Sequence, residues 1–228
     1  AKMMGADWIE LDVQQTKDGR VVVSHDTNLY RVSGVDKYIY DLKYDEIKKI
    51  DVGSFYGKEF SKERVPLLSD VIFYAKENGI RLNIEIKPTG HETDLEKQVV
   101  DMIHEYHFQN LCVVASQSYG SIEKVKEYSD DIMTVYVSGV EYKDYTSFTA
   151  ADAFSIDANF VTSDLVHQIH AQGKELYVWT INTEEDIQRM IDMNVDNIIT
   201  DNIELCREVV VKQRSSNFVQ SFIDYLGE

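Results

Sequence analysis

The stretch WIELDV at residues 8–13 alternates apolar and acidic side chains. Successive side chains of a β-strand point to opposite faces, so Glu10 and Asp12 share one face and the apolar residues share the other. The stretch LNIEIK at residues 82–87 repeats this pattern and places Glu85 and Lys87 on one face. Both stretches therefore predict strands with one apolar face and one charged face.

Strand-like and helix-like segments alternate along the rest of the chain. Seven strands are predicted, each followed by a helix or a helical stub, at residues 8–13, 81–87, 111–116, 132–138, 153–157, 175–181 and 197–200. Strict alternation predicts a parallel sheet with right-handed crossovers. With the helix remnant before residue 8, the pattern predicts an α/β fold, a TIM (β/α)8 barrel whose first β/α unit is missing from this chain.

An open doubly wound sheet is the alternative topology, but the glycine-rich phosphate loop expected in it is absent from the sequence. We expect one barrel domain over residues 1–228, with an insertion at about 26–66 after the first acidic strand. Ser69 or Asp70 is expected to cap the helix after this insertion. The apolar spacing in the tail predicts a short docked helix at 215–228.

The composition is that of a globular protein, with 43% hydrophobic and 28% charged residues. The net charge of −17 argues against a nucleic-acid partner and against attachment to anionic lipid through a basic patch. It also disfavours a phosphate ligand unless a cation lies between that ligand and the acidic groups. No apolar run reaches the roughly 18 residues of a membrane span. Cys112 and Cys206 are expected to be small buried hydrophobes.

Three carboxylates, those of Glu10, Asp12 and Glu85, are predicted to converge near the carboxyl ends of the strands, where barrel enzymes place their active sites. Carboxylates that converge away from water repel one another unless they protonate or are paired. A divalent cation resolves this conflict, and an all-oxygen site suits Mg²⁺ or Ca²⁺. An ordinary antiparallel strand with a wet polar face is the alternative, but two such strands in a β/α chain favour the cation site.

His25 and Asp26 end the apolar stretch VVV at residues 21–23, and a histidine at a strand end can act as a general acid or base. A surface histidine that only closes the strand is the alternative. His91 follows Lys87 in the next loop and is a weaker candidate for the site. Trp179 either stacks on a ligand or packs in the barrel mouth. HExxH, GxSxG and CxxC motifs are absent, which excludes zincins, serine hydrolases and dithiol redox proteins.

Six stretches resemble the glycerophosphodiester phosphodiesterase family of (β/α)8 barrels, in family order: GADWIELDV (5–13), TKDGRVVVSHD (16–26), PLL (66–68), LNIEIKP (82–88), VWTIN (178–182) and VDNIITD (195–201). The resemblance implies that Glu10, Asp12 and Glu85 bind the metal. It also implies that His25 is the second catalytic histidine and that Lys87 faces the substrate phosphate. The runs PTGHE (88–92) and QS (117–118) are similar to a bacterial branch whose barrel follows membrane-spanning segments.

The family's first strand ends in His-Arg-Gly, and no stretch of this chain matches that motif. The resemblance implies metal-dependent hydrolysis of a small glycerophosphodiester to glycerol 3-phosphate and an alcohol, with Ca²⁺ or Mg²⁺ as cofactor. It further implies a soluble domain joined to a membrane by upstream residues, with a cytoplasmic protein as the alternative. Because the motif is absent, a catalytically silent barrel that binds phosphodiesters or serves at a membrane remains the alternative function. A sugar isomerase explains the carboxylates but neither the insertion nor Lys87.

Overall fold

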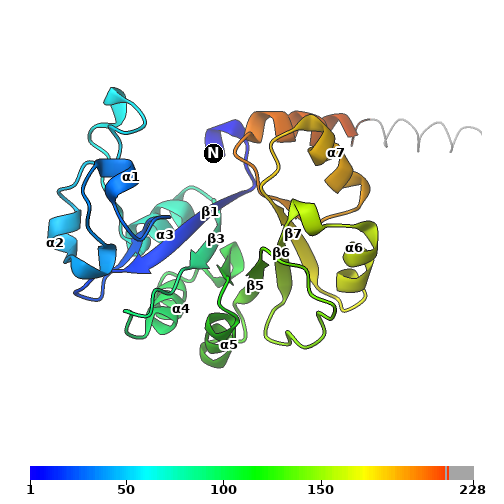
Figure 1. The fold of residues 1–228 in the computed structure, drawn as a ribbon, viewed down its shortest axis with the longest axis horizontal. Helices are drawn as coiled ribbons and strands as arrows, with labels where there is room; N and C mark the ends of the chain where they lie inside the picture. The colour runs from blue at the N-terminus through cyan, green and yellow to red at the C-terminus, as the bar shows by residue number, and fades with distance from the viewer. Residues whose placement is uncertain (214, 216–228) are drawn as a thin grey trace, which may run out of the picture. The chain divides into compact units, whose positions relative to one another are not determined.

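The computed structural model describes residues 1–213 and 215, which form two compact units (Figure 1). The first unit contains Trp8–Val137 and Phe148–Asp152, and the second contains Ala1–Asp7, Ser138–Ser147 and the described residues from 153 onward. The predicted tail helix falls at 215–228, outside the described residues except for Ser215. A single barrel domain over 1–228 with an insertion at about 26–66 stays a prediction.

The strands of the first unit are joined mainly by parallel pairing. They are β1 (Trp8–Gln15), β2 (Val21–Val23), β3 (Arg81–Ile86), β4 (Cys112–Ser116) and β5 (Met133–Ser138). Their order is β2-β1-β3-β4-β5, and only the β1–β2 pair is antiparallel. Parallel neighbours joined through helices confirm the predicted α/β class and are consistent with a TIM-type fold.

The helices of the first unit follow the strands in the predicted order. They are α1 (Tyr30–Ser33), α2 (Tyr44–Ile47), α3 (Leu68–Glu77), α4 (Leu95–Glu105) and α5 (Tyr119–Tyr128), with 3-10 turns at Ile39–Asp41, Lys58–Phe60 and Gln109–Leu111. The prediction that Ser69 or Asp70 caps α3 is wrong, because the helix begins at Leu68 with Leu67 at the N-cap position. Leu67 is held extended by its bridge to Val22, so the helix begins directly after it.

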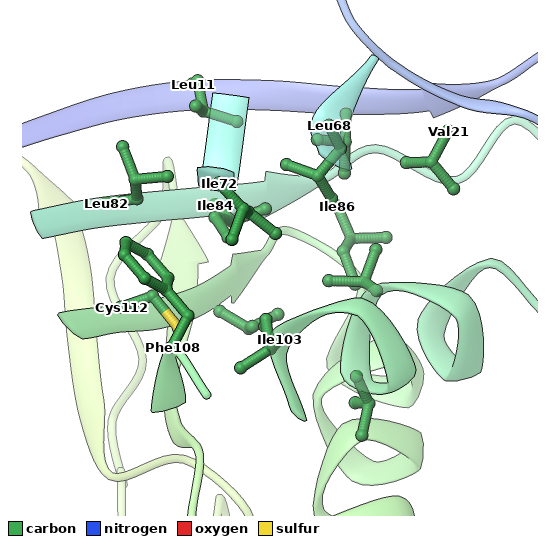
Figure 2. Close-up of a cluster of buried hydrophobic side chains, with 14 of the residues drawn as sticks. Leu11, Val21, Leu68, Ile72, Leu82, Ile84, Ile86, Ile103, Phe108 and Cys112 are labelled. Atoms are coloured by element: carbon green, nitrogen blue, oxygen red, sulfur yellow. The ribbon is translucent and has the colours of Figure 1, made fainter. Parts of the chain in front are cut away.

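A hydrophobic core lies between the β1–β3–β4 strands and the helices α3 and α4 (Figure 2). Leu11, Ile84 and Ile86 are buried in it, which confirms the predicted apolar faces of the two acidic strands. Helix α4 contributes Val99 and Ile103, four residues apart and therefore on one face. Because the apolar faces pack under the helices, the charged faces of β1 and β3 point the other way.

Residues 26–66 contain a second, smaller core. Its buried members are Val22 from β2 together with Leu29, Ile39, Leu42, Ile47 and Val65. This core joins the segment to β2, the strand that precedes His25. The segment is therefore a folded layer with its own packing.

The second unit repeats the strand-then-helix order. Its strands are β6 (Ala153–Asp157), β7 (Glu175–Trp179) and β8 (Asn197–Ile198), paired in parallel in that order. Its helices are α6 (Ser163–His170), α7 (Glu184–Asp192) and a further helix at 203–213, with 3-10 turns at Lys2–Met4 and Ala158–Phe160. Thr162 and Thr183 cap α6 and α7 by accepting backbone N–H hydrogen bonds.

None of the helices among the described residues is both long enough and apolar enough to cross a bilayer. Cys112 is buried in the first core, as predicted, whereas Cys206 is only half-buried. Burial raises the pKa of the Cys112 thiol to about 12, so this side chain stays a neutral packing group.

We predict that Ile84→Ala lowers the free energy of unfolding by about 2–5 kcal/mol, because Ile84 is fully buried and its truncation leaves a cavity in this core. Phe73→Ala on α3 is the matched control, since this side chain is exposed and its loss should change stability by less than about 0.5 kcal/mol. Urea unfolding followed by circular dichroism measures both values. Equal decreases in the free energy of unfolding for the Ile84 and Phe73 variants would contradict the position of the core.

Candidate metal and catalytic site

The parallel register of β1 and β3 brings the three predicted carboxylates together. Asp12 lies opposite Glu85, and Glu10 lies two residues earlier on the same face of β1. Oxygen atoms of Glu10, Asp12 and Glu85 all lie within 4.8 Å of one another. Separations of this size are within the reach of one cation with carboxylate ligands.

The ionisation of Glu10 and of Glu85 is perturbed in this cluster. The pKa of Glu10 is raised to about 7, first because the surrounding protein desolvates its carboxyl group and then because Asp12 and Glu85 repel its charge. The pKa of Glu85 is also raised, chiefly by desolvation and also by Asp12, although Lys87 opposes the shift. Like charges held together at a partly dry strand end are unstable unless a cation or a proton compensates them.

Lys87 supplies part of this compensation. Its backbone N–H donates to the carbonyl of Val13 at 3.3 Å, which extends the β1–β3 pairing past the end of β3. Its Nζ lies 2.6 Å from Asp12 Oδ1, and Asp12 is the most buried of the three acids. Lys87 therefore lies beside the carboxylates, as the sequence predicted, and one positive charge faces three negative ones.

The site face also contains an unsatisfied oxygen. Asn83 pairs with Glu10 across the two strands and is buried, and its Oδ1 has no hydrogen-bond partner within the described residues. A buried amide oxygen without a partner is costly. Carboxylate and amide oxygens are the ligand types that Mg²⁺ and Ca²⁺ take, so the donor set on this face fits a hard divalent cation.

Gln14 fixes the position of His25, and sequence reasoning missed it. It follows Glu10 and Asp12 on the same face of β1, and its Nε2 donates to the carbonyl oxygens of Ser24 at 3.0 Å and His25 at 3.1 Å. The backbone N–H of Ser24 in turn donates to the carbonyl of Asp12 at 2.9 Å. The alternation of β1, continued to residue 14, could have indicated that Gln14 lies on the same face as the acids. Its partners could not be predicted, because the antiparallel pairing of β1 with β2 brings the residues after β2 beside it.

The side chain of His25 is oriented by Asp26 and Arg31. Its Nδ1 lies 2.7 Å from Asp26 Oδ1, and Arg31 contacts the same carboxylate with Nε at 2.5 Å and Nη2 at 3.1 Å. The Arg31 and His25 contacts lower the pKa of Asp26 to about 2, so this carboxylate is ionised and only accepts. Nδ1 of His25 must then carry the proton, which leaves Nε2 as the basic nitrogen.

The loop after β3 is tied to neighbouring elements by polar and aromatic contacts. The Gln15 side chain accepts from the Thr93 N–H at 2.7 Å and donates to its carbonyl at 2.9 Å. His91, expected near the site, stacks on Tyr40 with ring centroids 3.9 Å apart. The structure thus gives His91 a packing partner in the 26–66 segment, and this stack links that segment to the loop beside Lys87.

Trp179 is the last residue of β7 in the second unit, and its Nε1 has no hydrogen-bond partner within the described residues. A substrate-binding role for Trp179 stays a prediction.

In the second unit, the Asn182 side chain donates to Asp201 at 3.0 Å and accepts from the Asp201 backbone at 2.9 Å. Asn202 accepts the N–H of Leu205 at the start of the last described helix. The two motifs VWTIN and VDNIITD therefore meet through Asn182.

Comparison with known proteins shows the family. The sequence model of the "Glycerophosphoryl diester phosphodiesterase family" matches residues 1–205 of this chain. The chain belongs to this family of hydrolases. A glycerophosphodiester phosphodiesterase of Caldanaerobacter subterraneus subsp. tengcongensis is 33% identical over 217 residues, covering 93% of this chain and 89% of that protein. A human lysophospholipase D, GDPD1, is 29% identical, covering 88% of this chain and 76% of that protein.

Solved structures share the fold. A phosphodiesterase of Oleispira antarctica, in complex with its product sn-glycerol-3-phosphate, has a TM-score of 0.82 and 24% identity, covering 91% of this chain and 86% of that chain. A glycerophosphodiester phosphodiesterase of Parabacteroides distasonis has a TM-score of 0.79 and 25% identity, covering 95% and 87%. Membership of the phosphodiesterase family favours that interpretation over the sugar isomerase. The missing first unit and the membrane-fused branch stay predictions.

We predict that Glu10→Gln raises the melting temperature in excess chelator at pH 8. The pKa of Glu10 is about 7 in the folded protein and 4.5 ordinarily, so ionisation of this group costs more in the folded chain than in the unfolded one. The free energy of unfolding therefore falls as the pH rises from 4.5 to about 7, and the loss persists above pH 7. The variant should therefore match wild type near pH 4.5 and exceed it at pH 8. Thermal unfolding by calorimetry measures the difference. A difference independent of pH would contradict the repulsion between the carboxylates.

Proposed function

We propose that the chain hydrolyses glycerophosphodiesters to glycerol 3-phosphate and an alcohol in a reaction that depends on Ca²⁺ or Mg²⁺. The observation that supports this best is the convergence of Glu10, Asp12 and Glu85 beside Lys87. The product complex of the Oleispira antarctica phosphodiesterase supports the substrate class. Membership of the family supports the reaction type.

Glu10, Asp12 and Glu85 would hold the cation, and the unpaired Asn83 Oδ1 lies on the same face. When bound, the cation supplies Lewis-acid stabilisation of the phosphoryl oxygens and of the attacking hydroxyl. The ammonium of Lys87 attracts the phosphate of the diester, and its contact with Asp12 holds it at the carboxylate cluster. This arrangement removes the conflict between a chain of net charge −17 and an anionic substrate.

His25 would move protons in the reaction through Nε2. Asp26 holds the Nδ1 proton, so Nε2 can take the proton of the attacking hydroxyl or, once protonated, give it to the departing alkoxide as the P–O bond breaks. The attacker is either water or the glycerol hydroxyl next to the phosphate, which gives a cyclic phosphate first. Arg31 positions His25 through its carboxylate partner Asp26, and Gln14 positions it through its backbone carbonyl.

We predict that Glu85→Gln lowers kcat/KM for glycerophosphocholine by about 100-fold or more, because it removes a charged cation ligand while the size of the side chain is kept. Excess chelator should abolish release of glycerol 3-phosphate from the wild type. Asp101→Asn is the matched control, since Asp101 is an exposed acid on α4 paired with Lys97. Undiminished hydrolysis by Glu85→Gln or in chelator would contradict the cation site. Absence of hydrolysis by the wild type would favour the catalytically silent alternative.

His25→Gln is expected to lower kcat by about 10²–10⁴-fold with little change in KM, because general acid–base catalysis acts on the transition state. His91→Gln should retain most of the activity, since His91 stacks on Tyr40 and makes no contact with the carboxylates among the described interactions. Steady-state kinetics on glycerophosphocholine separates the two variants. Equal kcat values for the two would contradict the role of His25.

A further inference from the structure

A loop at residues 53–62, here called the aromatic loop, exposes three large rings to solvent. Phe55 is 60% exposed, Tyr56 82% and Phe60 38%. The loop, coloured cyan in Figure 1, projects away from α1 and α2. Single exposed apolar residues are ordinary on a protein surface, but three within six positions form a patch that needs an explanation.

The aromatic loop is built to hold these rings outward. The carboxylate of Asp51 accepts the N–H groups of Gly53 and Ser54 at 2.9 Å each and the Ser54 hydroxyl at 2.5 Å. The backbone closes tightly, since a β-carbon on Gly53 would lie 1.9 Å from the Phe60 carbonyl oxygen. Tyr56 packs edge-on against Phe60 with ring centroids 5.4 Å apart.

The rings are not needed for the core beneath them. The base of the loop is closed by the N–H of Val52, which donates to the carbonyl of Glu63 at 3.3 Å. Val65 is buried in the small core of the 26–66 segment, and Val52 packs against it. None of the three rings belongs to that core. The three rings therefore lie outside the core that holds this segment together.

The size of the loop favours a lipid bilayer over a folded protein as the partner. A stable protein interface buries about 800 Å² on each side and involves about 20–30 residues. One ten-residue projection with three rings offers much less. A bilayer surface needs only a few aromatic side chains inserted at the depth of the headgroups, where rings with one polar end, such as Tyr56, are favoured.

The charges on the loop also fit a phospholipid surface. Lys58 and Lys62 are exposed, and no ion pair within the described residues holds either of them. Arg64 follows, with its guanidinium on the carbonyls of Ser61 and Glu63. Glu59 is also exposed and lies between the two lysines, so the charged side chains of residues 53–62 are two cations and one anion. Charges more than about 8–10 Å away are screened at physiological salt, so this small local excess of positive charge counts for more than the distant acidic surface.

We propose that the aromatic loop docks this protein on a phospholipid bilayer, with Phe55, Tyr56 and Phe60 inserted among the headgroups and Lys58 and Lys62 on the lipid phosphates. The net charge of −17 excludes attachment through a broad basic surface, so the rings carry the binding and the lysines assist. The docking is independent of the proposed catalytic function, because no residue of the loop belongs to the carboxylate site.

Co-sedimentation with sucrose-loaded vesicles tests the proposal, using phosphatidylcholine with and without about one-third phosphatidylglycerol. The wild type should bind both kinds, and Phe55→Ser/Tyr56→Ser/Phe60→Ser should bind about tenfold less. The Lys58→Gln/Lys62→Gln variant should bind equally well to vesicles with and without phosphatidylglycerol, whereas the wild type should bind better to those that contain it. Phe73→Ser/Tyr74→Ser is the matched control, because these α3 rings are 56% and 61% exposed but lie outside the loop, and it should bind like the wild type.

Failure of the wild type to bind vesicles would overturn the proposal, as would equal losses in the loop variant and the α3 control. A dimer that the loop substitutions convert to a monomer in light scattering would also overturn it, since the partner would then be a second copy. Hydrolysis of soluble glycerophosphocholine should be unchanged in the loop variants, which shows that they fold. Vesicle binding without any hydrolysis would contradict the proposed function while leaving the docking intact.

Discussion

Repulsion among three carboxylates on one face of two paired strands is the constraint on which the site depends. The apolar faces of β1 and β3 pack under α3 and α4, which leaves the acidic side chains on the opposite face, and the register of the two strands then brings oxygens of Glu10, Asp12 and Glu85 within 4.8 Å of one another. Core packing and strand pairing together therefore hold close groups that would otherwise separate. One lysine compensates only part of the charge, and a divalent cation of the proposed kind would compensate the rest.

A second set of contacts places the proton-transfer group relative to this cluster. Gln14 extends the charged face of β1 and holds the backbone of His25, while Asp26 and Arg31 fix its ring. Strand β2 joins the same sheet through antiparallel pairing, so the strand that precedes His25 lies beside the strand that carries Glu10 and Asp12. This placement matters because acid–base catalysis requires a basic nitrogen within hydrogen-bond reach of its proton.

Much of this could be predicted from the sequence. The alternation at 8–13 and 82–87 was sufficient to assign each side chain to one face of its strand. This assignment was sufficient to predict that the carboxylates and Lys87 lie together. Strand register cannot be predicted from alternation, which says nothing of whether Asp12 or Glu10 lies opposite Glu85. Gln14 and Arg31 were missed because their partners are set by the turn after β2 and by α1. The α3 cap was predicted wrongly because a tertiary bridge at Leu67 overrides a local Ser or Asp preference.

The central claim is that Glu10, Asp12 and Glu85 form one divalent cation site. Isothermal titration of Mg²⁺ and of Ca²⁺ into the chelator-stripped chain near pH 7, in two buffers of different ionisation heat, tests it most directly. We expect one cation to bind per chain, protons to be released on binding because Glu10 is partly protonated at this pH, and both to be lost in the Glu10→Gln/Asp12→Asn/Glu85→Gln variant. No binding by the wild type, or binding unchanged in the triple variant, would contradict it.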